Sequence, residues 1–201
     1  PAATHAAMAA MQHVHAQTSQ REAVDDLLLA EWVDKPITEL LSVSRAPRIR
    51  DGLRVMQSDL RSALEGAHVT TSLVHGDFVA GNVLGMDAPP HFTLTGIVDW
   101  ELSSRRGLPE TDILRWWLVG DPRNTAEVAA SWSMGSDLIA EVPAALDSPL
   151  PNAETTPKIL ATLTWLRIAA RDASLLPRAH RSAAWVQQNV TPMLVPAKEA
   201  R

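Results

Sequence analysis

Two short motifs contain the residue types that phosphate chemistry needs. The first runs from His75 through Gly76 and Asp77 to Asn82, and the second ends a hydrophobic run with Asp99. Phosphoryl transfer needs a carboxylate that orients and deprotonates an acceptor hydroxyl, and oxygen ligands that hold Mg²⁺ against the phosphates. Mg²⁺ takes few protein ligands, so Asn82 and Asp99 would be sufficient for it. The motifs predict a phosphoryl-transfer site if their side chains meet.

The same residues also have simpler interpretations. An Asp that follows Gly, like Asp77, is often a turn or cap residue, and Asn82 or Asp99 alone could serve a turn or a strand end. The pair His75 and Asp77 could instead ligate Zn²⁺ in a hydrolase, but no H-x-H or H-E-x-x-H partner accompanies it. We favour the phosphoryl-transfer interpretation because all three residues occur together and in order.

Mostly helical segments surround the motifs, with a small group of strands between them. Both motifs stand at strand ends, and loops at strand ends commonly carry chemistry. The expected fold class is α+β, mainly α, with a small strand cluster that bears the catalytic loop. Apolar spacing and turn residues predict helices over 2–17, 47–66, 112–119, 125–139, 157–176 and 179–190, strands over 71–74, 82–84 and 92–98, and a turn at Pro89 and Pro90.

The pattern H-G-D-x-x-x-x-N, followed by a hydrophobic strand that ends in D-W, resembles the aminoglycoside phosphotransferase and choline kinase group, distant relatives of protein kinases. The resemblance implies that Asp77 is the catalytic base and that Asn82 and Asp99 bind the metal that accompanies ATP. It also implies that residues 1–201 form the C-terminal lobe of a kinase-like fold, which bears the catalytic and substrate-binding residues. The implied cofactors are Mg²⁺ and ATP, with ATP as the phosphoryl donor.

Further residues extend the resemblance on both sides of the motifs. The segment from Gly107 to Asp112 is similar to the family's G-x-P-x-x-D segment, whose aspartate opens the next helix and supports the catalytic loop. We therefore expect Asp112 to be a supporting residue. We expect the same of His75, with its ring bonded to backbone carbonyls near the loop. His13 and His15 lie where the family often has a Leu-His-Ala helix, and we expect both, with His5, at the surface or in a groove.

The chain departs from the family in the residues that grip ATP. Nothing in it matches the strand-rich N-terminal lobe, its phosphate-covering loop or its strand lysine; Lys35 directly precedes Pro36, which is a poor context for that lysine. Val79 and Ala80 stand where the family usually has a polar or bulky residue and Pro. We therefore expect this chain to be inactive alone, with the missing lobe or another partner packing on the exposed cleft.

Composition excludes several classes of protein. The net charge is −5, and only three Lys are present (Lys35, Lys158, Lys198), which argues against nucleic-acid binding. No apolar run is long enough to span a bilayer, so no membrane contact is expected. The absence of Cys excludes disulfides and thiolate metal sites, and it fits a cytoplasmic protein. The excess of acidic residues would suit a cationic substrate.

The leading hypothesis is an ATP-dependent O-phosphotransferase that acts on a hydroxyl of a small molecule. A second hypothesis is a kinase-like lobe kept as a non-catalytic binding or regulatory module of a larger protein. The third is the metal-dependent hydrolase. Acceptor identity is beyond the sequence, because fold does not determine substrate.

Overall fold

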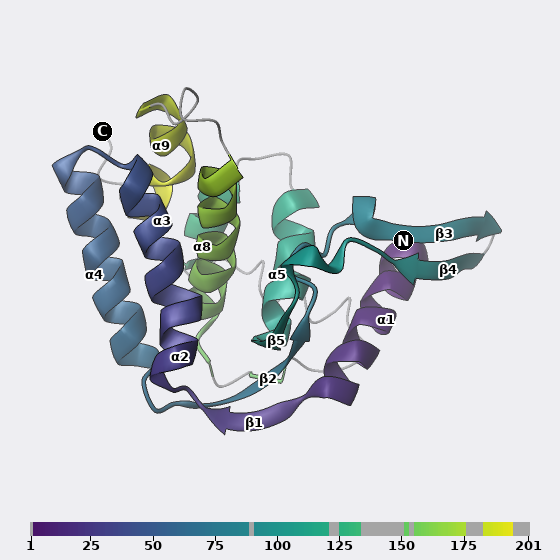
Figure 1. Cartoon of the computed structure of the whole chain (residues 1–201). Helices are drawn as coiled ribbons and strands as arrows, with labels where there is room; N and C mark the ends of the chain where they lie inside the picture. The colour runs from purple at the N-terminus through teal and green to yellow at the C-terminus, as the bar shows by residue number, and fades with distance from the viewer. Residues whose placement is uncertain are drawn as a thin grey trace. The chain divides into compact units, whose positions relative to one another are not determined.

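The computed structural model describes residues 2–88, 91–120, 125–133, 151–152, 155–175 and 183–194. The chain divides into two compact units, one formed by Pro1–Glu22, Val69–Gly120 and Asp137–Thr156, the other by Ala23–His68, Asp121–Ser136 and Pro157–Arg201. Helices predominate among the described residues, and the strands are short and antiparallel where their pairing is defined (Figure 1). The expected mainly helical α+β class is confirmed.

The first unit contains both motifs. Its helices and strands are α1 (Ala2–Thr18), β1 (Gln20–Ala23), β2 (His68–Val74), η2 (Ala80–Asn82), β3 (Val83–Ala88), β4 (His91–Ile97), η3 (Trp100–Leu102), β5 (Ser104–Gly107) and α5 (Pro109–Gly120). One sheet has the order β1-β2-β5, and β3 and β4 form a separate hairpin. Helix α1 packs against β4 and also contacts α5 (Figure 1).

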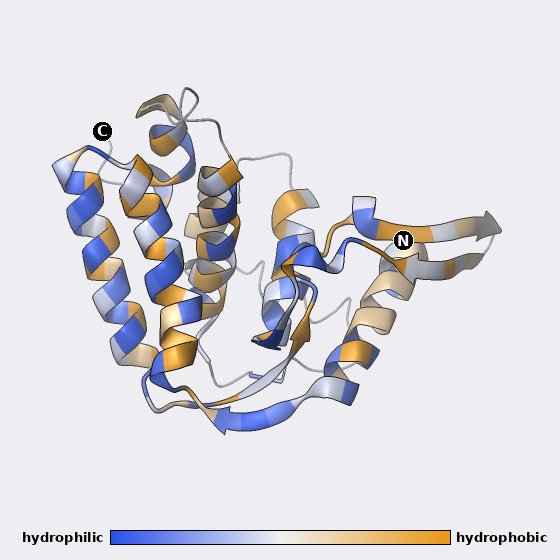
Figure 2. Cartoon of the chain, in the orientation of Figure 1, coloured by the Kyte–Doolittle hydropathy of each residue, from blue (hydrophilic) through white to orange (hydrophobic). Residues whose placement is uncertain are grey.

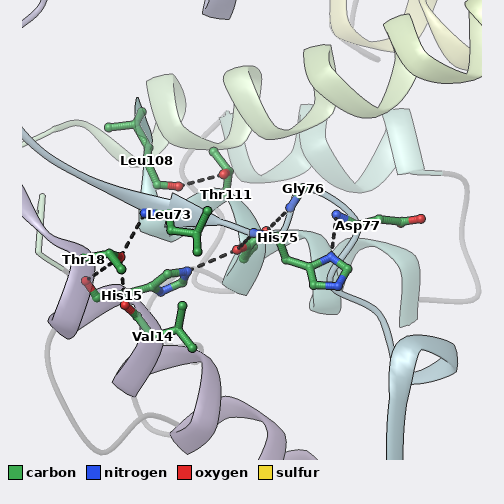
Figure 3. A network of polar contacts seen from close by, with 10 residues as sticks. Val14, His15, Thr18, Leu73, His75, Gly76, Asp77, Leu108 and Thr111 are labelled. Atoms are coloured by element: carbon green, nitrogen blue, oxygen red, sulfur yellow. Dashed lines mark hydrogen bonds and ion pairs between the residues drawn. The ribbon is translucent and has the colours of Figure 1, made fainter. Parts of the chain in front are cut away.

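The sheet forms the base from which the first motif emerges. Strand β2 pairs with β5 through Ser72 opposite Gly107 and Val74 opposite Ser104, with an irregularity between the two pairs. A Cβ at Gly107 would lie 2.2 Å from Cγ2 of Val74, so only glycine allows the strands to approach this closely. The Thr18 hydroxyl accepts the Leu73 N–H at 3.0 Å and so joins the end of α1 to β2 (Figure 3).

The regular structure in the described part of the second unit is helical apart from the ends of two strands. It comprises α2 (Asp26–Leu29), the π-helical turn η1 (Ala30–Asp34), α3 (Lys35–Val43), α4 (Pro47–Leu64), α6 (Thr125–Ser133), α8 (Pro157–Leu175), α9 (Ala183–Asn189) and α10 (Thr191–Leu194). Helix α8 packs against α3 and α6. Trp165, on α8, is almost wholly buried and donates its indole N–H to the Asn189 carbonyl at 3.0 Å.

Two prolines explain local helix geometry in this unit. Pro47 begins α4, where its missing N–H would have no intrahelical partner. Pro36 lies near the start of α3 and cannot donate to the carbonyl of Trp32, and the wider π-helical turn just before it accommodates that loss. Leu53 and Leu60 are buried on one side of α4, while much of the surface of this helix is hydrophilic (Figure 2).

Most of the expected elements exist, with boundaries shifted by a few residues. The helices expected over 2–17, 47–66, 112–119 and 157–176 are α1, α4, α5 and α8, and the three expected strands are β2, β3 and β4. Strands β1 and β5 were not predicted. The turn at Pro89 and Pro90, the end of the helix expected over 125–139 and the start of that expected over 179–190 lie outside the described residues.

Candidate active site

Asp112 holds the start of the first motif. It lies in the first turn of α5, where a carboxylate is favoured by the helix dipole, and it is 1% exposed. Its Oδ2 accepts the His75 N–H at 2.7 Å and its Oδ1 accepts the Gly76 N–H at 2.8 Å. Gly76 has a φ of 81°, which side chains disfavour, so glycine allows the turn that presents both amides (Figure 3). The carboxylate therefore determines where the chain leaves β2.

His15 provides a third donor to the same carboxylate. Its Nε2 lies 3.1 Å from Oδ2 of Asp112, and His15 is 5% exposed. We expected His15 at the surface or in a groove; it is buried instead, because α1 packs this face against α5. Asp112 thus accepts three hydrogen bonds in a buried setting, which offsets the cost of burying its charge.

The ring of His75 connects the two motifs through their backbones. Its Nε2 lies 2.8 Å from the Val98 carbonyl, which can only accept, so Nε2 carries the proton. Its Nδ1 then accepts the Asp77 N–H at 3.2 Å (Figure 3). Both partners therefore select one neutral tautomer. The Trp100 ring lies 4.6 Å from that of His75, between centroids, and covers it.

Asp77 is buried and bonded to an arginine that sequence reasoning missed. Arg115, on α5, donates to Oδ1 of Asp77 from Nε at 2.9 Å and from Nη2 at 2.5 Å. Side-chain exposure is 9% for Arg115 and 11% for Asp77, so water screens the pair poorly. A sequence signal existed: Arg115 follows Asp112 by three positions, so both lie on one face of a helix that is otherwise largely apolar.

Phe78 and Asn82 complete the first motif. Phe78 is fully buried, and its ring lies 4.9 Å from that of Trp116, which anchors the chain directly after Asp77. The Asn82 amide donates from Nδ2 to the Asp77 carbonyl at 2.9 Å, and this bond orients the side chain. In that orientation Oδ1 is the atom suited to a cation. The loop is thus held at its beginning, middle and end.

Asp99 occupies a different environment. It is exposed and adopts the left-handed conformation, with φ 65° and ψ 57°, which is uncommon for residues other than glycine. Backbone contacts bring its segment to the first motif: the Val98 N–H donates to the Asn82 carbonyl at 2.9 Å, beside the His75 contact. The structure thus joins the backbones of the two motifs.

Glu110 is a second buried acid on α5, and it binds Asn152. Oε1 of Glu110 accepts the Asn152 N–H at 2.7 Å, and Oε2 accepts from Nδ2 of Asn152 at 3.0 Å. The Asn152 amide also pairs with both backbone groups of Thr70 on β2. Burial raises the pKa of Glu110, and the two bonds from Asn152 only partly oppose this.

The described residues contain no group of three or more His, Cys, Asp or Glu that could hold a metal ion. None of the described helices combines the length and apolarity that crossing a membrane requires.

Comparisons with known proteins find similarity only at the level of structure. No protein-family model matches the chain, and no curated protein matches it. The chain is similar to a glucosamine kinase in crystal form A, with 19% identity and a TM-score of 0.43 over 98% of this chain and 51% of that one. For crystal form B the values are 17%, 0.42, 95% and 52%. The chain spans about half the length of these kinases. At such values the likeness carries no argument about activity, which rests on the residues.

Proposed function

We propose that this chain is the catalytic lobe of an ATP-dependent O-phosphotransferase that acts on a hydroxyl of a small molecule. The observation that supports the proposal best is the way α5 holds the first motif, with Asp112 on the amides of His75 and Gly76 and Arg115 on the carboxylate of Asp77. So many buried polar contacts on one short loop are costly to assemble for a simple turn. They are suited to keeping one carboxylate in one place.

In the proposed reaction Asp77 orients the acceptor hydroxyl and takes its proton as the acceptor oxygen bonds to the γ-phosphorus and ADP leaves. Asn82 and Asp99 would hold Mg²⁺, which neutralises charge on the phosphates when it is bound. The donors fit this ion, because both offer oxygen atoms and Asp99 is exposed enough to be reached. Rate enhancement would come mainly from positioning and charge neutralisation.

We also propose that residues outside this chain provide the lobe that grips the phosphates of ATP. Nothing in the sequence offers a Gly-rich phosphate loop or a suitably placed lysine. The 201-residue chain should therefore bind Mg-ATP no more tightly than about millimolar, which is roughly −4 kcal/mol. Micromolar affinity in a calorimetric titration of this chain would contradict that part of the proposal. Use of ATP, together with the absence of Cys, also favours a cytoplasmic location.

The decisive experiment uses the natural full-length protein and a panel of hydroxylated amines, including aminoglycosides, choline and amino sugars, with ADP release as the readout. Replacement Asp77→Asn keeps the shape and removes the base, so turnover should fall by about 10²–10⁴-fold. The matched control is Asp59→Asn, which changes an exposed Asp on α4 and should leave turnover unchanged. Wild-type turnover in Asp77→Asn would exclude the proposed role.

The contact between Arg115 and Asp77 also suits the alternative, a kinase-like binding or regulatory module. A carboxylate already engaged by a guanidinium could be a purely structural ion pair. The same panel separates the two functions. A module would release no ADP with any acceptor, and Asp77→Asn would then change stability but no activity.

A further inference from the structure

Helix α5 contacts three consecutive residues of the motif from one face. Asp112 takes the amides of His75 and Gly76, and Arg115, one turn later, takes the carboxylate of Asp77. The first two contacts hold backbone, but the third holds the functional group itself. Arg115 therefore has a different task from Asp112. The proposed reaction assigns roles to Asp77, Asn82 and Asp99 but none to Arg115.

The geometry of the contact restricts the Asp77 carboxylate strongly. Nε and Nη2 lie on one edge of the guanidinium, and both donate to the single atom Oδ1, at 2.9 and 2.5 Å. A carboxylate is planar, so fixing Oδ1 from two directions also limits where the second oxygen points. Lysine could not reproduce this, because its ammonium is a point charge without a planar edge.

We propose that Arg115 is a positioning residue for phosphoryl transfer, which holds the Asp77 carboxylate aimed at the acceptor hydroxyl. This inference rests on the proposed function. The proton moves from the acceptor hydroxyl to the Asp77 carboxylate, the acceptor oxygen bonds to the γ-phosphorus, and the bond to the bridging oxygen of ADP breaks. Arg115 neither gains nor loses a proton in this step.

The test compares Arg115→Ala and Arg115→Lys with wild type in the full-length protein, using Mg-ATP and an acceptor that the wild type turns over. Misaligned catalytic groups typically cost about 100-fold, so kcat should fall by that order in Arg115→Ala. KM for Mg-ATP and for the acceptor should change little, because Arg115 acts on the base and not on binding. Added guanidinium ion, at millimolar and so non-denaturing concentration, should restore part of the kcat of Arg115→Ala.

The control variant is Arg105→Ala, which removes an exposed arginine of β5 and should neither lose kcat nor respond to guanidinium. If Arg115→Ala fails to fold, Arg115→Lys carries the test, since it keeps the charge but loses the planar edge. Its kcat should lie below that of wild type. Wild-type kcat in either variant overturns this inference and leaves the role of Asp77 intact. Equal turnover in wild type and Asp77→Asn overturns the proposed function, and this inference with it.

Discussion

The two motifs differ sharply in how the protein holds them. Residues 75–82, the Asp77 loop, are tied down by Asp112, Arg115 and His75, and its central carboxylate is buried. Residues 98–102, the Asp99 turn, are held by backbone contacts and by the Trp100 indole, which donates to the Ile97 carbonyl at 2.8 Å. Asp99 itself is exposed and in a strained conformation.

This difference indicates that the two motifs have different tasks in the proposed site. A base must be placed accurately before the substrate arrives, so protein contacts have to fix it. A metal ligand can be drawn into place by the cation, whose charge is the largest in such a site. The Asp77 loop should therefore be important for stability and the Asp99 turn for nucleotide binding. Variants of Asp112 and Asp99 test that contrast.

The largest effect should come from Asp112→Ala. This change leaves two buried backbone N–H groups and His15 without their acceptor, so the free energy of unfolding should fall by about 3–5 kcal/mol. Asp99→Ala removes an exposed side chain and should change it by less than about 0.5 kcal/mol. Urea unfolding of the 201-residue chain measures both. Equal losses of unfolding free energy in the two variants would contradict the proposed difference between the Asp77 loop and the Asp99 turn.

The second effect concerns the affinity for Mg-ATP, for which we expect the Asp99 turn to be important. In the full-length protein Asp99→Ala should weaken binding by more than about 100-fold, since loss of a metal ligand should exceed the 10–100-fold typical of outer partners. The matched control is Glu101→Gln, two residues further along the same turn and also exposed. Calorimetry with Mg-ATP should show near wild-type affinity for that control. Wild-type affinity in Asp99→Ala would remove Asp99 from the metal site.

A smaller effect concerns the pH dependence of the unfolding free energy, and it tests Glu110, the second buried acid of α5. Burial raises the pKa of Glu110 above 4.5, so the folded state retains a proton that the unfolded chain has lost. Its contribution to stability is complete below about pH 4.5 and decreases as pH rises through the folded pKa, with a slope of at most about 1.4 kcal/mol per pH unit.

Glu110→Gln cannot titrate, so its unfolding free energy should lack this decrease. Urea unfolding at a series of pH values above 4.5 compares the variant with wild type. Identical pH profiles would mean that the proton on Glu110 does not contribute, and that Asn152 is held by the ionised form.

The smallest effect tests whether the left-handed backbone conformation of Asp99 lowers the stability of the chain. Glycine adopts positive φ without penalty, so Asp99→Gly should stabilise the chain by about 0.5 kcal/mol, the strain relief being partly offset by extra freedom of the unfolded chain. Asp99→Ala keeps the Cβ and should show no such gain. Thermal unfolding measures both variants. A loss of stability in Asp99→Gly would mean that the side chain supports the turn.

Several parts of the fold followed from local sequence. Proline at the start and leucines at helical spacing predicted α4, and the long apolar pattern after Pro157 predicted α8. Strands β1 and β5 escaped prediction because QREA and SRRG show no alternation of apolar and polar residues. They are strands because they flank β2, and backbone pairing does not depend on side-chain pattern.

The sequence by itself determined the residue types of the candidate site, since H-G-D-x-x-x-x-N and the later D-W can be recognised without coordinates. Only the tertiary structure decided what surrounds them. It buried His15 against Asp112 across 97 positions of chain and placed Arg115 on Asp77 across 38. Such contacts depend on how α1 and α5 pack beside β2, and packing is a property of the whole unit. A motif can therefore specify which groups are available, but distant helices determine which atoms they meet.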